Sequence, residues 1–305
     1  MNTTRVFANM SAVINSGRLN GERLRRIIES KTVADAFKVL GDYGYVYSEG
    51  ASVDGFIVGE TNRLIEFVAE ETASSKLADA LTARFKYNNV KLAYKSRFTA
   101  VPSDGYYAAD IDVNRITDGD YEDVDRFMAQ ALTELDEQNE SRPQAIDLAL
   151  TRAMYSYILS CPLAIVKKYA RAEIDMKNIL SAARMNKLKL SGEQFISGGR
   201  INVDTLVASL TEEPFASNFE RTPYAEYAER IAENDFSDLW KSEMEADDFL
   251  YYLTHRDVAA YSSFTPFLNY YTETLIELKT VKTALVCVKT NSRDLFYKRI
   301  PEIYK

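Results

Sequence analysis

The sequence is short of the residues that build tight turns. Its 305 residues include only 12 glycines and 7 prolines, about half of the usual combined share of roughly 12%. Sandwiches and barrels of β-strands need frequent turns, so this scarcity favours helices. Hydrophobic residues make up 46% of the chain and charged residues 27%, a balance that is typical of a folded globular protein and not of a disordered one.

Cysteine and long apolar runs are also lacking. The two cysteines, Cys161 and Cys287, are far apart and form no CxxC motif, which indicates a reducing compartment. No apolar run approaches the roughly 20 residues of a membrane span, and residues 1–17 lack the apolar core of a signal peptide. We therefore expect a cytoplasmic protein whose contact with any membrane is made through protein partners.

The charge balance narrows the choice of partner. The net charge is −8, and no basic stripe is present to neutralise the phosphates of a nucleic acid. The same acidity disfavours direct docking on anionic lipid headgroups. We expect protein partners and no nucleic acid.

The sequence also lacks the residue sets of common active sites. His255 is the only histidine, so catalytic triads depend on it alone and a di-iron bundle is excluded. It lies in His255-Arg256-Asp257, which resembles a kinase catalytic loop by chance, because the other kinase motifs are absent. The run from Ser197 to Arg200 has no GxxxxGK[ST] pattern and is interpreted as a turn between helices. We expect no catalytic, cofactor-binding or metal-binding residue and no direct ATP binding.

One acidic run leaves an enzyme as a minor alternative. Glu245-Ala246-Asp247-Asp248 could hold a magnesium diphosphate in a class I terpene or prenyl synthase. However, Tyr251 replaces the third aspartate of a DDxxD motif. The second motif would begin at Asn234-Asp235, but it has Ser242 in place of its glutamate. A solvated acidic helix face is the simpler interpretation.

Helical periodicity dominates the chain. Apolar stripes at 6–14 and 33–40 predict two helices, the second with Thr32 and Asp35 in capping-box spacing and Gly41 as its stop. Later helices are predicted over 62–98 with a break near Ser74-Ser75, 146–165, 172–186, and from Thr265-Pro266 onward. The acidic stretch 101–125 is expected to be a connection. The predicted fold class is all-α.

Three segments of the chain resemble one another. They are the segments 85–92, 174–180 and 276–282, and their alignment places Asn89, Asn178 and Thr280 at one position. The separations of 89 and 102 positions suggest three helical units that together fill the chain. Asp175 and Asn178 share one helix face, and buried polar groups need partners. A structural hydrogen-bond network is the favoured interpretation, and a ligand site is the alternative.

These segments and their flanks resemble the C-type stalk subunits of the V-type/A-type ATP synthases, the counterparts of the eukaryotic d-type subunits. That family has three helical pseudo-repeats with an acid-x-x-Asn-apolar-basic signature. Lys86, Leu180 and Thr280 depart from it. The match continues through Ser191-Gly192-Glu193, Gly198-Gly199, 266–270 and 299–304. The residues that carry the signature are Asn89, Lys91, Glu173, Asp175, Asn178, Glu277 and Lys282.

The resemblance implies a non-catalytic protein of the central stalk. Three repeats, at about 1–105, 106–210 and 211–305, would form a funnel between the rotor axle subunits and the membrane proteolipid ring. The chain would then lie at the cytoplasmic face of the complex and transmit torque for ATP-coupled proton or sodium transport. Turns at Gly105, Gly198-Gly199 and Asn291 are expected at one end of the funnel. A helical-repeat scaffold with an unrelated partner is the alternative.

Overall fold

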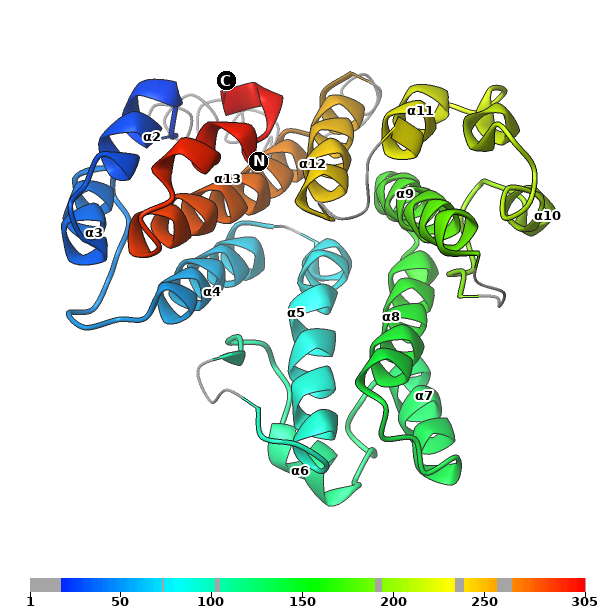
Figure 1. The fold of residues 1–305 in the computed structure, drawn as a ribbon. Coiled ribbons are helices and arrows are strands. Elements are labelled where there is room, and N and C mark those ends of the chain that lie inside the picture. The colour runs from blue at the N-terminus through cyan, green and yellow to red at the C-terminus, as the bar shows by residue number, and fades with distance from the viewer. Residues whose placement is uncertain are drawn as a thin grey trace. The chain divides into compact units, whose positions relative to one another are not determined.

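The computed structural model describes residues 18–72, 74–101, 105–189, 194–233, 239–256 and 265–304. Within these ranges every regular element is a helix and no strand is present, so the predicted all-α class is confirmed (Figure 1). The stripe at 6–14 lies outside the described residues. The chain divides into two compact units, residues 1–64 with 234–305 and residues 65–233.

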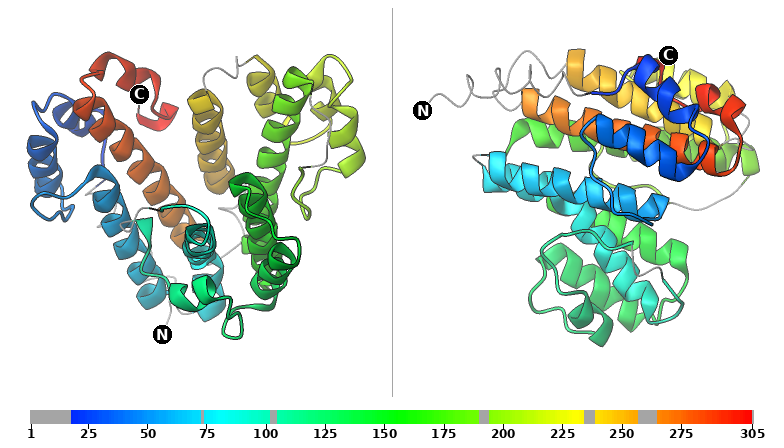
Figure 2. Two further views of the ribbon diagram at one scale, coloured as in Figure 1. Left: turned by 60° about the horizontal axis from the view of Figure 1, so that its bottom comes forward. Right: turned by 90° about the vertical axis from the view of Figure 1, so that its left-hand side faces the viewer.

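The first unit joins the two ends of the sequence. The helices α2 (Gly21–Ile28) and α3 (Val33–Asp42) pack against α13 (Thr265–Lys289), and α12 (Leu239–Arg256) packs beside it. Figure 2 shows the blue N-terminal helices lying along the orange and red α13. The chain then finishes with η3 (Arg293–Lys298) and η4 (Glu302–Tyr304). The resulting core includes Leu24, Ile27, Leu40, Val281, Leu285 and Phe296, all fully buried.

The second unit is a stack of long helices. The helix α4 (Val53–Glu71) crosses the boundary between the units, and α5 (Ser75–Ser96) follows it. The helix α8 (Pro143–Ser160) packs against both α5 and α7 (Arg126–Glu137). The buried helix α9 (Ala164–Leu188) contacts α8, α10 (Val203–Ala208) and α11 (Ala225–Glu233). The short helices α6 (Val113–Asp118) and η2 (Phe215–Phe219) pack on α5 and α11 respectively.

Side-chain caps define two helix starts: the cap at Thr32 was predicted, whereas at Ser74 only a break in the helix was predicted. The Thr32 hydroxyl accepts a hydrogen bond from the Asp35 backbone N–H at 3.1 Å, and Ser74 caps α5 through the Leu77 N–H. The predicted stop at Gly41 is wrong, because α3 continues through Asp42. The left-handed residue that follows is Gly44, with φ of +91°, a conformation that glycine adopts at low cost.

Two other boundaries also differ from prediction. The apolar pattern at 146–165 spans a break at Cys161, since Pro162 disfavours α-helical backbone there and the Cys161 ψ is 133°. As a result α9 begins at Ala164, well before the predicted 172. The acidic stretch 101–125 is not only a connection, because Asp112 caps the six-residue helix α6 within it.

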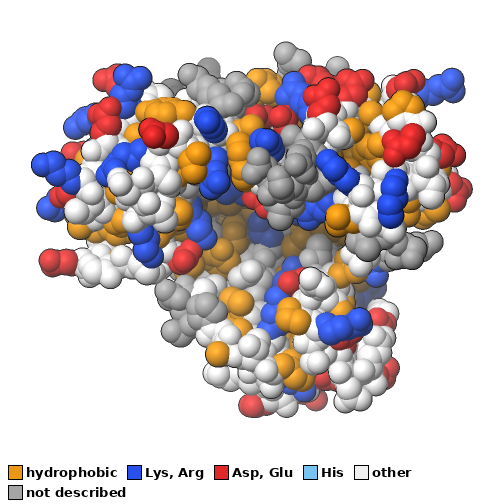
Figure 3. Space-filling view, viewed as in Figure 1, with side chains coloured by type: hydrophobic (Ala, Val, Ile, Leu, Met, Phe, Trp, Pro, Cys, Tyr) orange, Lys and Arg blue, Asp and Glu red, His pale blue; other side chains and the backbone are white. Residues whose placement is uncertain are grey.

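Side chains of both charge signs cover the surface. On the face shown in Figure 3, acidic and basic groups are interspersed with hydrophobic ones. Among the described residues, no helix is both long and apolar enough to span a bilayer.

Candidate functional site

The centre of the candidate site is a buried amide on α9. Asn178 donates from Nδ2 to the carbonyl oxygen of Ile196 and accepts from the Ile196 N–H through Oδ1, both at 2.8 Å. The amide therefore satisfies both backbone groups of one residue in the irregular segment that follows the helix. We call this two-bond contact an asparagine clamp. We call the irregular segment after each such helix its return segment. The clamp fixes the return segment against the helix that precedes it.

A second asparagine clamp lies on α5. Asn89 donates to the carbonyl oxygen of Tyr107 at 2.8 Å and accepts from the Tyr107 N–H at 2.9 Å. In both clamps the held residue lies 18 positions after the asparagine. Both amides are buried, so loss of either would leave polar backbone groups without their partner. Two asparagines 89 positions apart thus hold their return segments by the same contact.

Asp175 extends the clamp on α9. Its fully buried carboxylate accepts from the N–H groups of Arg200 at 2.9 Å and Ile201 at 3.1 Å. Burial, and after it the Asp175 charge, raises the pKa of the Tyr224 hydroxyl. A Cβ at Gly199 would collide with the Asp175 carboxylate. Glycine is therefore required for this close approach. The N–H groups of Arg200 and Ile201, which could bind an anion, already donate to the Asp175 carboxylate.

An ion pair links equivalent positions of α5 and α9. The Arg84 guanidinium lies 3.1 Å from Glu173 Oε1 and 3.2 Å from Oε2. These residues are 89 positions apart, the same separation as between Asn89 and Asn178. The Glu173 side chain is 8% exposed and the Arg84 side chain 26%, so the pair is partly shielded from solvent and ties one helix to the other.

The basic positions of the signature have different surroundings. Lys91 donates to the Thr151 hydroxyl at 2.7 Å, and burial lowers the pKa of its ammonium to about 8. Lys282 instead pairs with Asp54 at 2.6 Å on the exposed side of α13. A shared sequence position therefore leads to a buried cation in one helix and a surface ion pair in another.

The third helix, α13, has no asparagine clamp. The Thr280 hydroxyl donates to the carbonyl oxygen of Ile276 in its own helix at 2.9 Å. Glu277, at the position of Asp175, accepts from the Leu19 N–H at 3.1 Å and the Tyr45 hydroxyl at 2.6 Å. Burial raises the pKa of the Glu277 carboxyl. This acid therefore holds the beginning of the described chain and not a return segment.

The four predicted interface-turn residues belong to both units. Gly105, Gly198 and Gly199 lie in the second unit, whereas Asn291 lies in the first. Gly198 and Asn291 have φ of +99° and +53°, so both follow their helices in left-handed conformation. Their common location at one end of the molecule stays a prediction.

The acidic run on α12 was expected to be a solvated face, and this expectation is wrong. Asp247 and Asp248 are only 7% and 3% exposed. The Lys279 ammonium of α13 lies 2.5 Å from Asp247 Oδ1, which explains how one carboxylate is accommodated in a buried position. Asn234 and Asp235, the start of the second predicted synthase motif, lie outside the described residues. In the described part of the chain, no group of three or more His, Cys, Asp or Glu side chains could hold a metal ion.

His255 has partners that sequence reasoning missed. Its Nδ1 lies 2.8 Å from the carbonyl oxygen of Tyr251, and its Nε2 lies 2.7 Å from Glu273 Oε1. Arg18 approaches the other Glu273 oxygen at 2.9 Å. The hydrogen bond to the Glu273 carboxylate raises the pKa of His255. Asp257, the acid of the kinase-like triplet, lies outside the described residues.

Sequence reasoning also missed Arg84, Tyr107 and Ile196. The available signal for Arg84 was its separation of 89 positions from Glu173, equal to that of the two asparagines. The clamped residues carried no such signal, because a backbone partner can be any residue type.

Comparison with known protein families shows which of them the chain is similar to. The model of the family described as ATP synthase (C/AC39) subunit matches residues 10–299. No curated protein matches the chain.

Proposed function

The chain belongs to the ATP synthase C/AC39 subunit family, and from this premise we propose that it is a non-catalytic part of the central stalk of a V/A-type ATPase. In this role it links the rotor axle subunits to the membrane proteolipid ring at the cytoplasmic face of the complex. It passes torque between them and thereby couples ATP turnover to proton or sodium transport. The match over residues 10–299 is the observation that carries this proposal.

The polar faces of the long helices support a mechanical role. The clamps at Asn89 and Asn178 fix irregular segments to rigid helices, and the partly buried ion pair between Arg84 and Glu173 ties α5 to α9. A connector that transmits torque must resist deformation, and close-packed interiors with satisfied polar groups do so. We propose that these signature residues serve stiffness and that the chain supplies no catalytic residue.

The same contacts favour a structural network over a ligand site at Asp175 and Asn178. Asp175 is occupied by the N–H groups of Arg200 and Ile201, and Asn178 by Ile196. A phosphate at the 197–200 turn would have to displace a buried carboxylate of the protein itself. We therefore propose no cofactor and no direct ATP binding, so that ATP is handled by other subunits.

Co-purification from source membranes tests this function. The tagged chain is expressed in place of the native one, the membranes are solubilised in mild detergent, and captured subunits are identified and quantified by mass spectrometry. We expect the axle subunits and the ring proteolipid in constant ratio to the tagged chain. A matched Val207→Ala variant, changed at an exposed residue, should behave the same and controls for the substitution itself.

Two outcomes would contradict the proposal. Recovery of the intact tagged chain without axle or ring subunits would favour the helical-repeat scaffold with another partner. Hydrolysis of ATP by the purified chain alone, at a rate that follows the protein through purification, would contradict the non-catalytic assignment.

A further inference from the structure

We propose that the pocket beside Thr280 is a docking site for a segment of a neighbouring protein of the stalk, with an apolar side chain in the pocket and a carboxylate at its rim. This inference rests on the proposed function for the identity of the assembly. It assigns a role to the place where the asparagine clamp is missing. We call this place the α13 pocket.

The α13 pocket lies on the helix face that the return segment covers elsewhere. On α5 this face contains Asn89 and Leu92, and a Cβ at Gly105 would lie 3.3 Å from Leu92 Cδ1. The aligned residues of α13 are Thr280 and Thr283, and both line a cavity of about 410 Å³. Ligand pockets typically measure roughly 300–1,000 Å³, so this cavity can receive one or two side chains.

The return segment of α13 passes the pocket without sealing it. Arg299 and Pro301 are part of its lining. The aligned position of the clamped Ile196 is Lys298, and the residue of α13 aligned with the clamp asparagines is Thr280, whose hydroxyl bonds within its own helix. The residue before Ile196, Phe195, is 7% exposed, whereas the residue before Lys298, Tyr297, is 44% exposed. After α9 the clamped segment carries the buried Phe195, and after α5 the clamped Tyr107 packs its ring against Phe85 of the helix, with 5.0 Å between the ring centres. An occupant from outside would therefore have the same chemistry.

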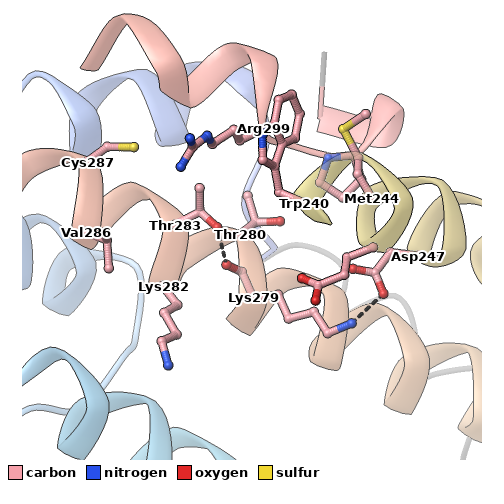
Figure 4. A pocket seen from close by; sticks show the side chains of 12 residues that line it. Trp240, Met244, Asp247, Lys279, Thr280, Lys282, Thr283, Val286, Cys287 and Arg299 are labelled. Carbon is pink, nitrogen blue, oxygen red and sulfur yellow. Dashed lines mark hydrogen bonds and ion pairs between the residues drawn. The ribbon is translucent and has the colours of Figure 1, made fainter. Parts of the chain in front are cut away.

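The lining indicates the character of the occupant. Trp240 and Met244 of α12 and Val286 and Cys287 of α13 provide apolar surface, which favours an apolar anchor residue. Figure 4 shows Trp240 and Arg299 lying together across the pocket from Lys279 and Lys282. The Arg299 guanidinium carbon lies 5.4 Å from the centre of the Trp240 ring, and such a stacked arginine presents its N–H edge to a carboxylate.

The charge at the rim agrees with this choice. Lys279 and Lys282 have exposed fractions of 61% and 49% at their side chains, and Arg299 is also exposed. The acids that line the pocket are Glu243 and Asp247. Lys279 is paired with Asp247 and Lys282 with Asp54, so we take Arg299 as the cation that receives the carboxylate of the occupant. The exposed Arg299 guanidinium beside Trp240 thus provides a positive group at the rim of an apolar pocket, and this group complements a carboxylate of the occupant.

Photo-crosslinking in the assembled complex tests the site. Val286 lines the pocket and is 39% exposed, and Val207 on α10 offers a matched control at 40%. A benzophenone amino acid is placed at either position of the tagged full-length chain, the purified complex is irradiated, and the crosslinked peptides are sequenced. We expect the Val286 probe to attach to one partner protein at a segment that combines apolar and acidic residues, and the Val207 probe not to attach there.

A second substitution in the chain that carries the Val286 probe shows whether the partner binds in the pocket or only lies near the probe. Thr283→Phe fills the cavity and Arg299→Glu reverses the rim charge, so each should reduce the yield of this adduct about tenfold. Arg299→Lys should retain most of it. Unchanged helical content by circular dichroism shows that a variant still folds.

Several results would overturn the proposal. These are an assembled complex with no Val286 adduct, an adduct within the same chain only, or an adduct whose yield is unchanged by Thr283→Phe. In each case the proposed function would stand, because the tagged chain has assembled. If the unmodified tagged chain fails to assemble, the proposed function and this inference both fail.

Discussion

The helices α9 and α13 have the same length, 25 residues each, but their polar faces hold different parts of the chain. On α9, Asp175 and Asn178 hold the return segment through four backbone groups. On α13, Glu277 holds Leu19 and Tyr45, while Thr280 bonds to its own helix. The two helices differ at two aligned positions of this face, Asp175 against Glu277 and Asn178 against Thr280. On α13 the acid therefore binds residues more than 200 positions away in sequence.

The comparison explains why α13 has a pocket at this face. An amide has both a donor and an acceptor and can satisfy both backbone groups of one residue. The threonine hydroxyl donates to the helix carbonyl at i−4. The return segment of α13 is consequently anchored through Phe296 in the core and not at Thr280.

The largest effect should come from Asp175→Ala. The substitution leaves the N–H groups of Arg200 and Ile201 without their acceptor at a buried site, and we expect it to lower the free energy of unfolding by about 3 kcal/mol. Chemical denaturation followed by circular dichroism measures this. Asp175→Asn keeps one acceptor oxygen, so its free energy of unfolding should fall by less than that of the alanine variant. A loss below about 1 kcal/mol for the alanine variant would show that the turn does not depend on this carboxylate.

The clamps themselves give the next effect. Asn178→Ala should cost about 2 kcal/mol, Asn89→Ala slightly less because the hydrogen bonds of its clamp with Tyr107 are less deeply buried, and Thr280→Ala below about 1 kcal/mol. The last cost is small because the Thr280 hydroxyl bonds within its own helix. The three variants are compared in one denaturation series. Equal losses at all three positions would remove the distinction between α9 and α13.

His255 should make the stability of the first unit depend on pH. Both ring nitrogens face oxygen acceptors, Tyr251 and Glu273, and Arg18 pairs with the same carboxylate. Because the folded pKa is raised above 6.5, the stabilisation is fully present below pH 6.5 and is lost as the pH rises through the folded value. Relative to His255→Gln, we expect an advantage of about 1 kcal/mol at low pH.

Nuclear magnetic resonance can follow this titration directly, since the chain has one histidine. A ring resonance whose pKa lies above 6.5 in the native protein, and moves toward the ordinary value in Glu273→Gln, would agree with the geometry. An advantage over His255→Gln that grows with increasing pH would contradict the assigned sign.

The smallest effect is expected for Glu277→Gln. A glutamine oxygen can accept from the Leu19 N–H, and its amide can donate to the Tyr45 hydroxyl, so both contacts survive without a buried charge. Stability at pH 7 should change by less than about 0.5 kcal/mol, measured by the same denaturation assay. A loss comparable to that of Asp175→Ala would show that the two acids are held alike.

Local chemistry allowed part of this fold to be predicted. The start of α3 at Thr32 depends on contacts within four residues, and so does the start of α5 at Ser74. The end of α8 was missed because apolar spacing continues across Cys161, although Pro162 gave a local signal. Periodicity reports which residues face a core, but it does not report where the backbone changes direction.

The site was less predictable because its partners are distant. Asn178 and Asp175 could be chosen from sequence as residues on one helix face, but Ile196 and Arg200 take part through backbone groups. The burial of Asp247 depends on Lys279 from another helix, and an acidic run alone indicates exposure. Side-chain patterns therefore identified the holding residues and not the segments that they hold.

The most direct test of the central claim is ion transport driven by ATP in vesicles that contain the other subunits of the V/A-type ATPase. Vesicles assembled without this chain, with it, and with the Val207→Ala control are compared for ATP hydrolysis and ion uptake together. We expect ion uptake to require the chain and to be restored when the purified chain is added back, with no ATP hydrolysis by the chain alone. Equal ion uptake per ATP hydrolysed with and without the chain would contradict its role as the coupling link.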